Sequence, residues 1–370
     1  MIDDHVDRAS TLPNSLDHAR WAYAWVGQLD EAIEAQGTAT ASAQLVLPFL
    51  TAAITSALLL GAAVRALDPD EILYVGPPGL GPDPSPMHRG HLQFWPRMGD
   101  APLARRLLPL VGSQVGAEFR AVDTRASQPL RHGARRSMVV EIARDIRRAH
   151  RLAGPEAGTG GHALITWMGG YGLRAVVGVV RDAGAGAVFL DRGRHYTRVL
   201  RPRRIGFEAL TPPIPVKIEE QWAEPAPNLL PLVDEIDRVA GLSGLGKVVA
   251  GRVGMFAGSI VPVVQDAATE LAQWFGRLGI TRVLTANPAS IEEFAALAAA
   301  GWCGITRELY QHGDHAFTYD PWLITELQHI DTFRTSDSTL TRDVPRAAVL
   351  IGARCPEIVV DSPRVASLQS

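Results

Sequence analysis

The residues best suited to chemistry form a short polar run directly after a predicted strand. The strand covers residues 305–310, and the run reads Gln311, His312, Gly313, Asp314 and His315. The ordinary pKa of histidine lies near neutral pH, so His312 suits the role of a general base. The run is the candidate catalytic site, with His312, Asp314 and His315 as catalytic residues.

Two other interpretations of the same run remain open. Alternate residues of an extended chain lie on one side of it, so His312, Asp314 and His315 could bind zinc. A fourth ligand is not evident in the sequence, and we therefore predict no metal. The histidines could also be polar residues that are satisfied at a strand end and take no part in catalysis.

A glycine-rich turn is the second candidate binding element. A predicted strand, residues 162–168, runs into Gly169, Gly170, Tyr171 and Gly172, and a predicted helix follows over 173–182. Such a turn can bring backbone N–H groups close to a phosphate or a sugar. The spacing matches neither the dinucleotide fingerprint nor the P-loop, and a tight turn that needs small residues explains it equally well.

A third group of residues supports an alternative activity. His88-Arg89-Gly90-His91 resembles the His-x-Gly-His signature of nucleotidylyltransferases, and residues 334–342, which end in Arg342, resemble their second signature. That activity would require His88 and His91 to lie at a helix N-terminus, with Arg342 within reach of a phosphate. Pro96 and Gly99 interrupt the helix that the first signature should open.

The elements around the polar run predict a β-α-β unit. Residues 282–286 form a β-rich run that Asn287-Pro288 ends. Ser290 and Glu293 have the spacing of a capping box for the helix that follows, and Gly301 is a natural end for that helix. Such a unit joins parallel strands, and open α/β sheets bind ligands outside the carboxyl ends of their strands.

The same alternation of strands and helices recurs along the chain. Further strands are predicted at 72–75, 163–168 and 187–191, a helix at 260–278, and short strands at 331–335, 347–351 and 357–360. The expected fold class is therefore α/β, with one or two Rossmann-like parallel sheets and helices on both faces.

Composition and length set the limits of this interpretation. The chain has 370 residues and a net charge of −3, so the total charge implies no affinity for nucleic acid. The two cysteines form no disulfide framework, and the N-terminus lacks the pattern of a signal peptide, so we predict a cytoplasmic protein. The uncharged run at 45–64 is long enough to cross a bilayer, but its composition favours a buried helix. Peripheral membrane contact is the alternative.

The expected domain organisation has three parts. Residues 1–36 should form an N-terminal helical segment, and 37–345 a Rossmann-like domain with a subdomain boundary near 151–161. Residues 346–370 should be a C-terminal extension or the start of a second domain.

The order of motifs from residue 282 onward carries a family resemblance. It comprises a strand, Asn287-Pro288, a capped helix, a strand, Gln311-His312-Gly313, then Trp322 and a strand ending in Thr335-Ser336-Asp337. This order resembles the N-terminal half of GT-B-type bacterial glycosyltransferases of capsule and surface-polysaccharide synthesis, with the glycerophosphate polymerases of teichoic acid as distant relatives. Residues 167–172 also look like the first glycine-rich turn of these enzymes, and the resemblance covers roughly residues 70 to 340.

The resemblance implies a function and a set of site residues. A histidine at the position of His312 would act as base toward the acceptor hydroxyl. The implied substrate contacts are Gly169, Gly170, Tyr171, Gly172, Asn287, Gln311, Gly313 and Asp337. GT-B enzymes bind the nucleotide-sugar donor mainly in a C-terminal domain, and only about 30 residues follow Leu340. The chain is thus expected to be the acceptor-side half of such an enzyme.

The expected ligands follow from this resemblance. They are a nucleotide-sugar as donor substrate and a surface-glycan acceptor, with no other cofactor and no nucleic acid. A homo-oligomer or a separate donor-binding domain would be the protein partner. The non-enzymatic alternative is a glycan-binding or scaffolding lobe.

Overall fold

The computed structural model describes the sheet and most of the helices that surround it. The described residues are 41–76, 101–123, 161–166, 179–180, 182–190, 208–210, 230–255, 261–285, 291–311, 330–335, 337–352 and 354–361.

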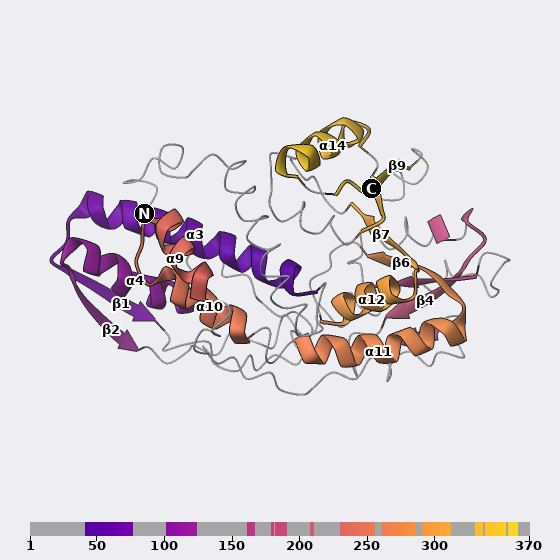
Figure 1. The fold of residues 1–370 in the computed structure, drawn as a ribbon, viewed down its shortest axis with the longest axis horizontal. Coiled ribbons are helices and arrows are strands. Elements are labelled where there is room, and N and C mark those ends of the chain that lie inside the picture. Colours follow the sequence, from indigo (N-terminus) through magenta and orange to yellow (C-terminus); the bar gives the residue numbers. More distant parts are fainter. Residues whose placement is uncertain are drawn as a thin grey trace, which may run out of the picture.

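A seven-stranded sheet occupies one end of the molecule (Figure 1). Its strands are β3 (His162–Ile165), β4 (Gly186–Leu190), β5 (Glu208–Leu210), β6 (Ile280–Thr285), β7 (Thr306–Tyr310), β8 (Thr332–Thr335) and β9 (Glu357–Val360). Their order across the sheet is β5-β4-β3-β6-β7-β8-β9, and every neighbouring pair is parallel.

This strand order is that of a doubly wound fold. The first three strands in the chain extend the sheet in one direction from β3, and the last four extend it in the other. The direction reverses between β3 and β6, where Ile165 pairs with Leu284. In such sheets the crevice for ligands lies at this reversal, outside the carboxyl ends of the two strands.

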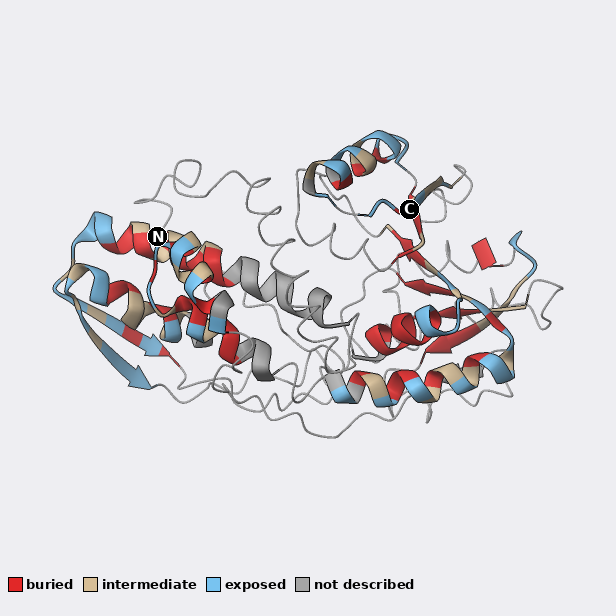
Figure 2. Cartoon of the chain, in the orientation of Figure 1, coloured by how far each residue is buried: buried red, intermediate tan, exposed pale blue. Residues whose placement is uncertain are grey.

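Three helices pack on the second half of the sheet. Helix α11 (Val261–Leu278) lies beside α12 (Ile291–Trp302), and α12 contacts both β6 and β7. Every side chain from residue 293 to residue 300 is buried, so the middle of α12 is enclosed, whereas Trp302 at its end is exposed (Figure 2). Helix α14 (Leu340–Ile351) contacts β9.

A second group of elements forms the other end of the molecule (Figure 1). Strands β1 (Glu71–Gly76) and β2 (Glu118–Asp123) form a two-stranded parallel sheet. Four helices accompany it: α3 (Ala41–Leu67), α4 (Ala101–Val115), α9 (Leu230–Ala240) and α10 (Leu245–Met255). Because α9 and α10 follow β5 and precede β6, the chain leaves the large sheet after its edge strand β5, packs against α3 and α4, and then returns to pair β6 with β3.

A tight turn joins α9 to α10. The Asp237 carboxylate accepts hydrogen bonds from the backbone N–H groups of Gly244 (2.8 Å) and Gly246 (2.6 Å), which caps the first turn of α10. A Cβ atom on Gly246 would lie 2.1 Å from the Val233 carbonyl oxygen. The two helices therefore approach each other more closely than any side chain at position 246 would allow.

The two groups share one hydrophobic core. Its buried residues include Ile54 of α3, Leu107 of α4, Ile236 of α9, Phe294 of α12 and Phe333 of β8. Helix α3 contacts both α11 and α12, and so links the two groups directly.

The predicted parallel arrangement is confirmed for all five strands that were used to predict it. The strand expected at 72–75 is β1, and those expected at 163–168, 187–191, 282–286 and 306–311 are β3, β4, β6 and β7. The α/β class is thereby established. Most of the helix predicted at 173–182, which would cover the second face, lies outside the described residues.

Two local predictions were wrong. Residues 347–351 are the last part of α14 and not a strand, because Leu340, Val344 and Ala348 bury one face with a period of four. Gly301 lies inside α12, and the turn into β7 is made by Gly304, whose φ is 66°. Only a residue that tolerates the left-handed region fits that turn, and position 301 does not require one.

The apolar run at 45–64 lies within α3. From residue 53 to residue 64 each side chain is buried or half-buried, in agreement with the predicted packing. Among the residues that the structure describes, no helix is long and apolar enough to cross a membrane.

Candidate functional site

The candidate site lies along the carboxyl edge of the large sheet. Of the residues predicted from sequence, Gln311 follows β7 and Asp337 follows β8 at this edge. The other predicted site residues lie outside the described residues: Gly169, Gly170, Tyr171, Gly172, Asn287, His312, Gly313, Asp314 and His315. His88 and His91 of the alternative activity also lie outside them, and Arg342 is an exposed residue of α14.

The structure connects Gln311 and Asp337 through Thr335, the last residue of β8. The Gln311 backbone N–H donates to the Arg334 carbonyl (2.8 Å), which fixes the start of the polar run beside β8. The Thr335 hydroxyl donates a short hydrogen bond to Gln311 Oε1 and accepts one from the Asp337 backbone N–H (2.9 Å). Two predicted substrate contacts thus belong to one hydrogen-bonded string.

The directions of these bonds orient the Gln311 amide. The Asp337 N–H can only donate, so the Thr335 oxygen accepts it, and the Thr335 O–H donates to Gln311 Oε1 with a second, longer contact to the Asp337 carbonyl (3.5 Å). The side-chain oxygen of Gln311 therefore faces Thr335, and its NH₂ group is directed away. Asp337 in turn accepts from the backbone N–H and the hydroxyl of Thr339 at 2.8 and 2.7 Å, which joins the string to the start of α14.

Two further threonines end the strands at the reversal point. Thr166 follows β3, Thr285 ends β6, and the Thr166 backbone N–H donates to the Leu284 carbonyl (2.9 Å). Both threonines have 0 % of their surface exposed, and neither hydroxyl has a hydrogen-bond partner. An unpaired buried hydroxyl costs about 1–3 kcal/mol.

The strand register places these polar residues on one face. Side chains alternate between the two faces of a sheet along each strand. The register places one set of polar side chains on the same face as the core residues Val283, Leu309 and Phe333, namely Thr166, Thr285, Gln311 and Thr335. This is the face on which α11 and α12 pack. The carboxyl edge therefore carries a row of hydroxyl and amide groups above an apolar core.

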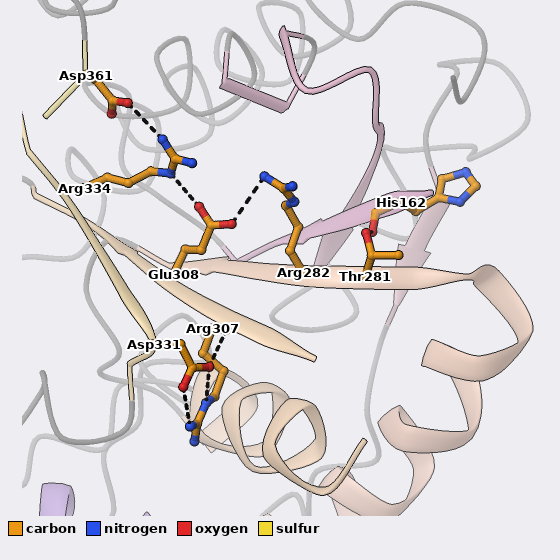
Figure 3. A network of polar contacts seen from close by, with 8 residues as sticks. All are labelled: His162, Thr281, Arg282, Arg307, Glu308, Asp331, Arg334 and Asp361. Atoms are coloured by element: carbon orange, nitrogen blue, oxygen red, sulfur yellow. Dashed lines mark hydrogen bonds and ion pairs between the residues drawn. The ribbon is translucent and has the colours of Figure 1, made fainter. Parts of the chain in front are cut away.

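A ladder of charged side chains crosses the opposite face (Figure 3). Arg282 of β6 lies 3.3 Å from Glu308 of β7, Glu308 accepts a short hydrogen bond from Arg334 of β8, and Arg334 donates to Asp361 (2.9 Å), which follows β9. In each of these three pairs, the residue on the later strand lies two register positions closer to the carboxyl edge than its partner on the preceding strand. The Glu308 side chain is only 4 % exposed, so this is a buried ion-pair network.

Burial and charge act against each other in this ladder. Burial raises the pKa of Asp361, as does the nearby Glu308, and together they outweigh the lowering by Arg334. One carboxylate oxygen of Asp361 is also buried without a hydrogen-bond partner. Burial lowers the pKa of Arg334, but its bonds to Glu308 and Asp361 raise it overall, so the guanidinium stays charged. We regard the ladder as a structural connection between four strands.

A separate ion pair holds the amino edge of the sheet. Asp331 accepts hydrogen bonds from the Arg307 backbone N–H (2.9 Å) and guanidinium (3.1 and 3.0 Å), and Arg354 lies 3.3 Å away. Burial alone would raise the pKa of Asp331, but the hydrogen bonds and charges of the two arginines lower it below its usual value. This cluster lies at the end of the strands away from the polar row.

No group of three or more histidine, cysteine, aspartate or glutamate side chains in the described part of the chain could hold a metal ion. The comparisons with known proteins add no assignment: no family model, no curated protein and no solved structure matches this chain.

Sequence reasoning did not identify three residues of this edge. Thr166 and Thr285 entered only as parts of predicted strands, which β-branched residues favour, and Thr335 entered as part of the motif Thr335-Ser336-Asp337 without a role of its own. The available signal was a threonine at or directly after the end of each strand.

Proposed function

We propose that this chain is a glycosyltransferase, or the acceptor-binding half of one, that moves a sugar from a nucleotide-sugar to a surface-glycan acceptor. The observation that carries the proposal is the string Gln311–Thr335–Asp337 at the carboxyl edge of a doubly wound parallel sheet. It links two residues proposed as substrate contacts, at the edge where such sheets bind ligands. The resemblance to the acceptor-side half of GT-B enzymes supports the same activity.

In this proposal His312 is the base. It follows Gln311 directly in the sequence. The imidazole takes the proton of the acceptor hydroxyl while the acceptor oxygen bonds to the anomeric carbon of the donor sugar. The bond from that carbon to the diphosphate breaks, and the diphosphate leaves with the electron pair. Backbone N–H groups of the glycine-rich segment 169–172, which the sequence predicts as a turn, are proposed to stabilise the charge that develops on it.

The test is transfer by the full chain, with the donor-binding domain that the complete enzyme uses supplied in the assay. Nucleotide-sugars are mixed with bacterial surface glycans, and release of the nucleoside diphosphate and growth of the glycan are both measured. His312→Ala should lower the rate by on the order of 10²–10⁴, the usual contribution of a positioned base. The control is His162→Ala, because His162 begins β3 at the opposite edge of the sheet.

The outcomes separate the proposed activity from its alternatives. If the His312→Ala variant still transfers sugar at a near-normal rate, His312 is not the catalytic base. Glycan binding without transfer by the unaltered chain would favour the glycan-binding lobe. Transfer of a nucleotidyl group from a nucleoside triphosphate would favour the nucleotidylyltransferase.

A further inference from the structure

Thr335, the last residue of β8, bonds to residues that follow three neighbouring strands. Its hydroxyl donates to Gln311 Oε1, after β7, and accepts the backbone N–H of Asp337 at 2.9 Å. Its backbone carbonyl accepts the N–H of Asp361, after β9, at 2.9 Å. Because 0 % of its surface is exposed, Thr335 cannot touch a ligand itself. Any effect that it has on a ligand must act through a residue to which it bonds.

Asp337 is the exposed residue of this group. Its Oδ1 atom accepts hydrogen bonds from the backbone N–H of Thr339 (2.8 Å) and from the Thr339 hydroxyl (2.7 Å). The bond from its own N–H to Thr335 holds its backbone. In the part of the chain that the structure describes, the second carboxylate oxygen, Oδ2, has no partner. The carboxylate is therefore held in one orientation at the carboxyl edge of the sheet, with one oxygen available.

An available carboxylate oxygen selects the chemistry of its ligand. A carboxylate accepts hydrogen bonds and donates none, so Asp337 suits a ligand group that donates. The hydroxyl groups of a sugar are such donors, whereas a phosphate is an anion that the carboxylate repels. A carboxylate that is already held in place binds better than a mobile one, because less conformational freedom is lost on binding. Gln311, the other side chain that Thr335 binds, already has a further interaction within the chain.

We propose that Thr335 is a positioning residue, which holds the Asp337 carboxylate so that it accepts a hydrogen bond from a hydroxyl group of the glycan acceptor. This inference rests on the proposed function, since it takes the ligand to be that acceptor. Positioning requires the hydroxyl of Thr335 and not its methyl group. A role in folding alone would make substrate binding follow the stability of each variant, whichever group is removed.

The first test measures positioning without a ligand. Thr335→Val removes the hydroxyl at nearly constant volume, and Thr335→Ser keeps the hydroxyl but removes the methyl group. Hydrogen exchange at the backbone amides of Asp337 and Thr339 should be faster in Thr335→Val and unchanged in Thr335→Ser. The matched control is Thr332→Val, which alters a buried threonine at the amino end of the same strand and should leave both amides unchanged. Unchanged exchange at both amides in Thr335→Val would overturn the proposal.

The second test is sugar transfer by the full chain, with the donor-binding domain supplied. In Thr335→Val the KM for the glycan acceptor should rise about tenfold, which is the usual effect of one lost hydrogen bond. The kcat and the KM for the nucleotide-sugar should stay nearly unchanged, because the contact holds the acceptor before and during the reaction. Thr335→Ser should restore the acceptor KM of the unaltered chain. An equal rise in KM in Thr335→Ser, or a comparable fall in kcat in Thr335→Val, would overturn the proposal.

A double-variant cycle identifies the residue through which Thr335 acts. Asp337→Asn should raise the acceptor KM by a similar factor of about ten. Adding Thr335→Val to that variant should raise the KM little further, because both substitutions remove the same contact. Losses that multiply would show that Thr335 acts on the acceptor by another route, and would overturn the proposal.

The two proposals fail separately. Sugar transfer with an acceptor KM that Thr335→Val leaves unchanged would retain the glycosyltransferase and remove the positioning role. Glycan binding without transfer, with an affinity that Thr335→Val lowers and Thr335→Ser does not, would retain the positioning role and remove the enzyme. If the unaltered chain neither binds glycan nor transfers sugar, the proposed function fails, and the acceptor assigned to Asp337 fails with it.

Discussion

Glu308 is the residue on which the charged ladder depends, because it connects two arginines on either side of it. Its side chain is 4 % exposed and lies 3.3 Å from Arg282. At an effective dielectric constant of about 20, two unit charges at this separation attract by about 5 kcal/mol. The cost of burying the ions offsets much of this attraction, so the intact ladder contributes little net stability.

Removing only the Glu308 charge should be costly. Glu308→Gln keeps the shape of the side chain but leaves Arg282 and Arg334 without their shared carboxylate. Breaking a buried pair in this way costs about 3–5 kcal/mol. The control is Asp343→Asn, whose partner Arg342 has a side chain 75 % exposed, and which should have little effect because water screens the pair.

Urea unfolding of both variants measures the difference. We expect the Glu308→Gln chain to unfold at clearly lower urea concentration than the Asp343→Asn chain. A double-mutant cycle with Arg282→Gln should show coupling of about 0.5–3 kcal/mol between the two positions. If Glu308→Gln costs no more than Asp343→Asn, the ladder is exposed to water and the reasoning from burial is wrong.

Two other predictions concern packing and pH. Gly246→Ala should destabilise the chain by about 1–3 kcal/mol or more in urea unfolding, because its Cβ would meet the Val233 carbonyl oxygen at 2.1 Å. Gly276→Ala in α11, where a Cβ would meet nothing within 4 Å, should instead be neutral or stabilising, and equal losses would contradict the close approach. Asp331 has a lowered pKa, so its contribution to stability should be present above its unfolded pKa and be lost as the pH falls through its folded pKa. The free energy of unfolding, measured between about pH 2 and 6, should fall less steeply with decreasing pH in Asp331→Asn than in the unaltered chain. An equal pH dependence in both chains would refute the contribution assigned to Asp331.

The parallel strands were predictable because each has a local signal. The strands around residues 164, 188 and 283 are short β-rich runs next to helical patterns, and strand–helix alternation implies parallel pairing. The position of Gln311 at a strand end followed from the same pattern. Helices α9 and α10 were not predicted, because they are short and are separated by glycines at 241 and 244.

The site itself needed the strand order. Thr166 and Thr285 are 119 positions apart in the chain, and only the pairing of β3 with β6 brings them together. The ladder is likewise invisible in sequence, because Arg282, Glu308 and Arg334 look like solvent-facing charges on three separate strands. Long-range register decides which charged residues meet, and no local pattern contains it.

The excursion of α9 and α10 from the sheet has a consequence for biosynthesis. In the folded sheet β3 lies between β4 and β6. Its partner β6 comes much later in the sequence, because Thr281 of β6 follows His162 of β3 by 119 residues. At about 5–20 residues per second, a ribosome needs roughly 6–24 s to synthesise that interval. During this time one side of β3 is an unpaired, apolar strand edge, which is a template for association with other chains. We therefore expect the yield of folded protein to depend on chaperones that protect the nascent β3–β5 segment until β6 emerges.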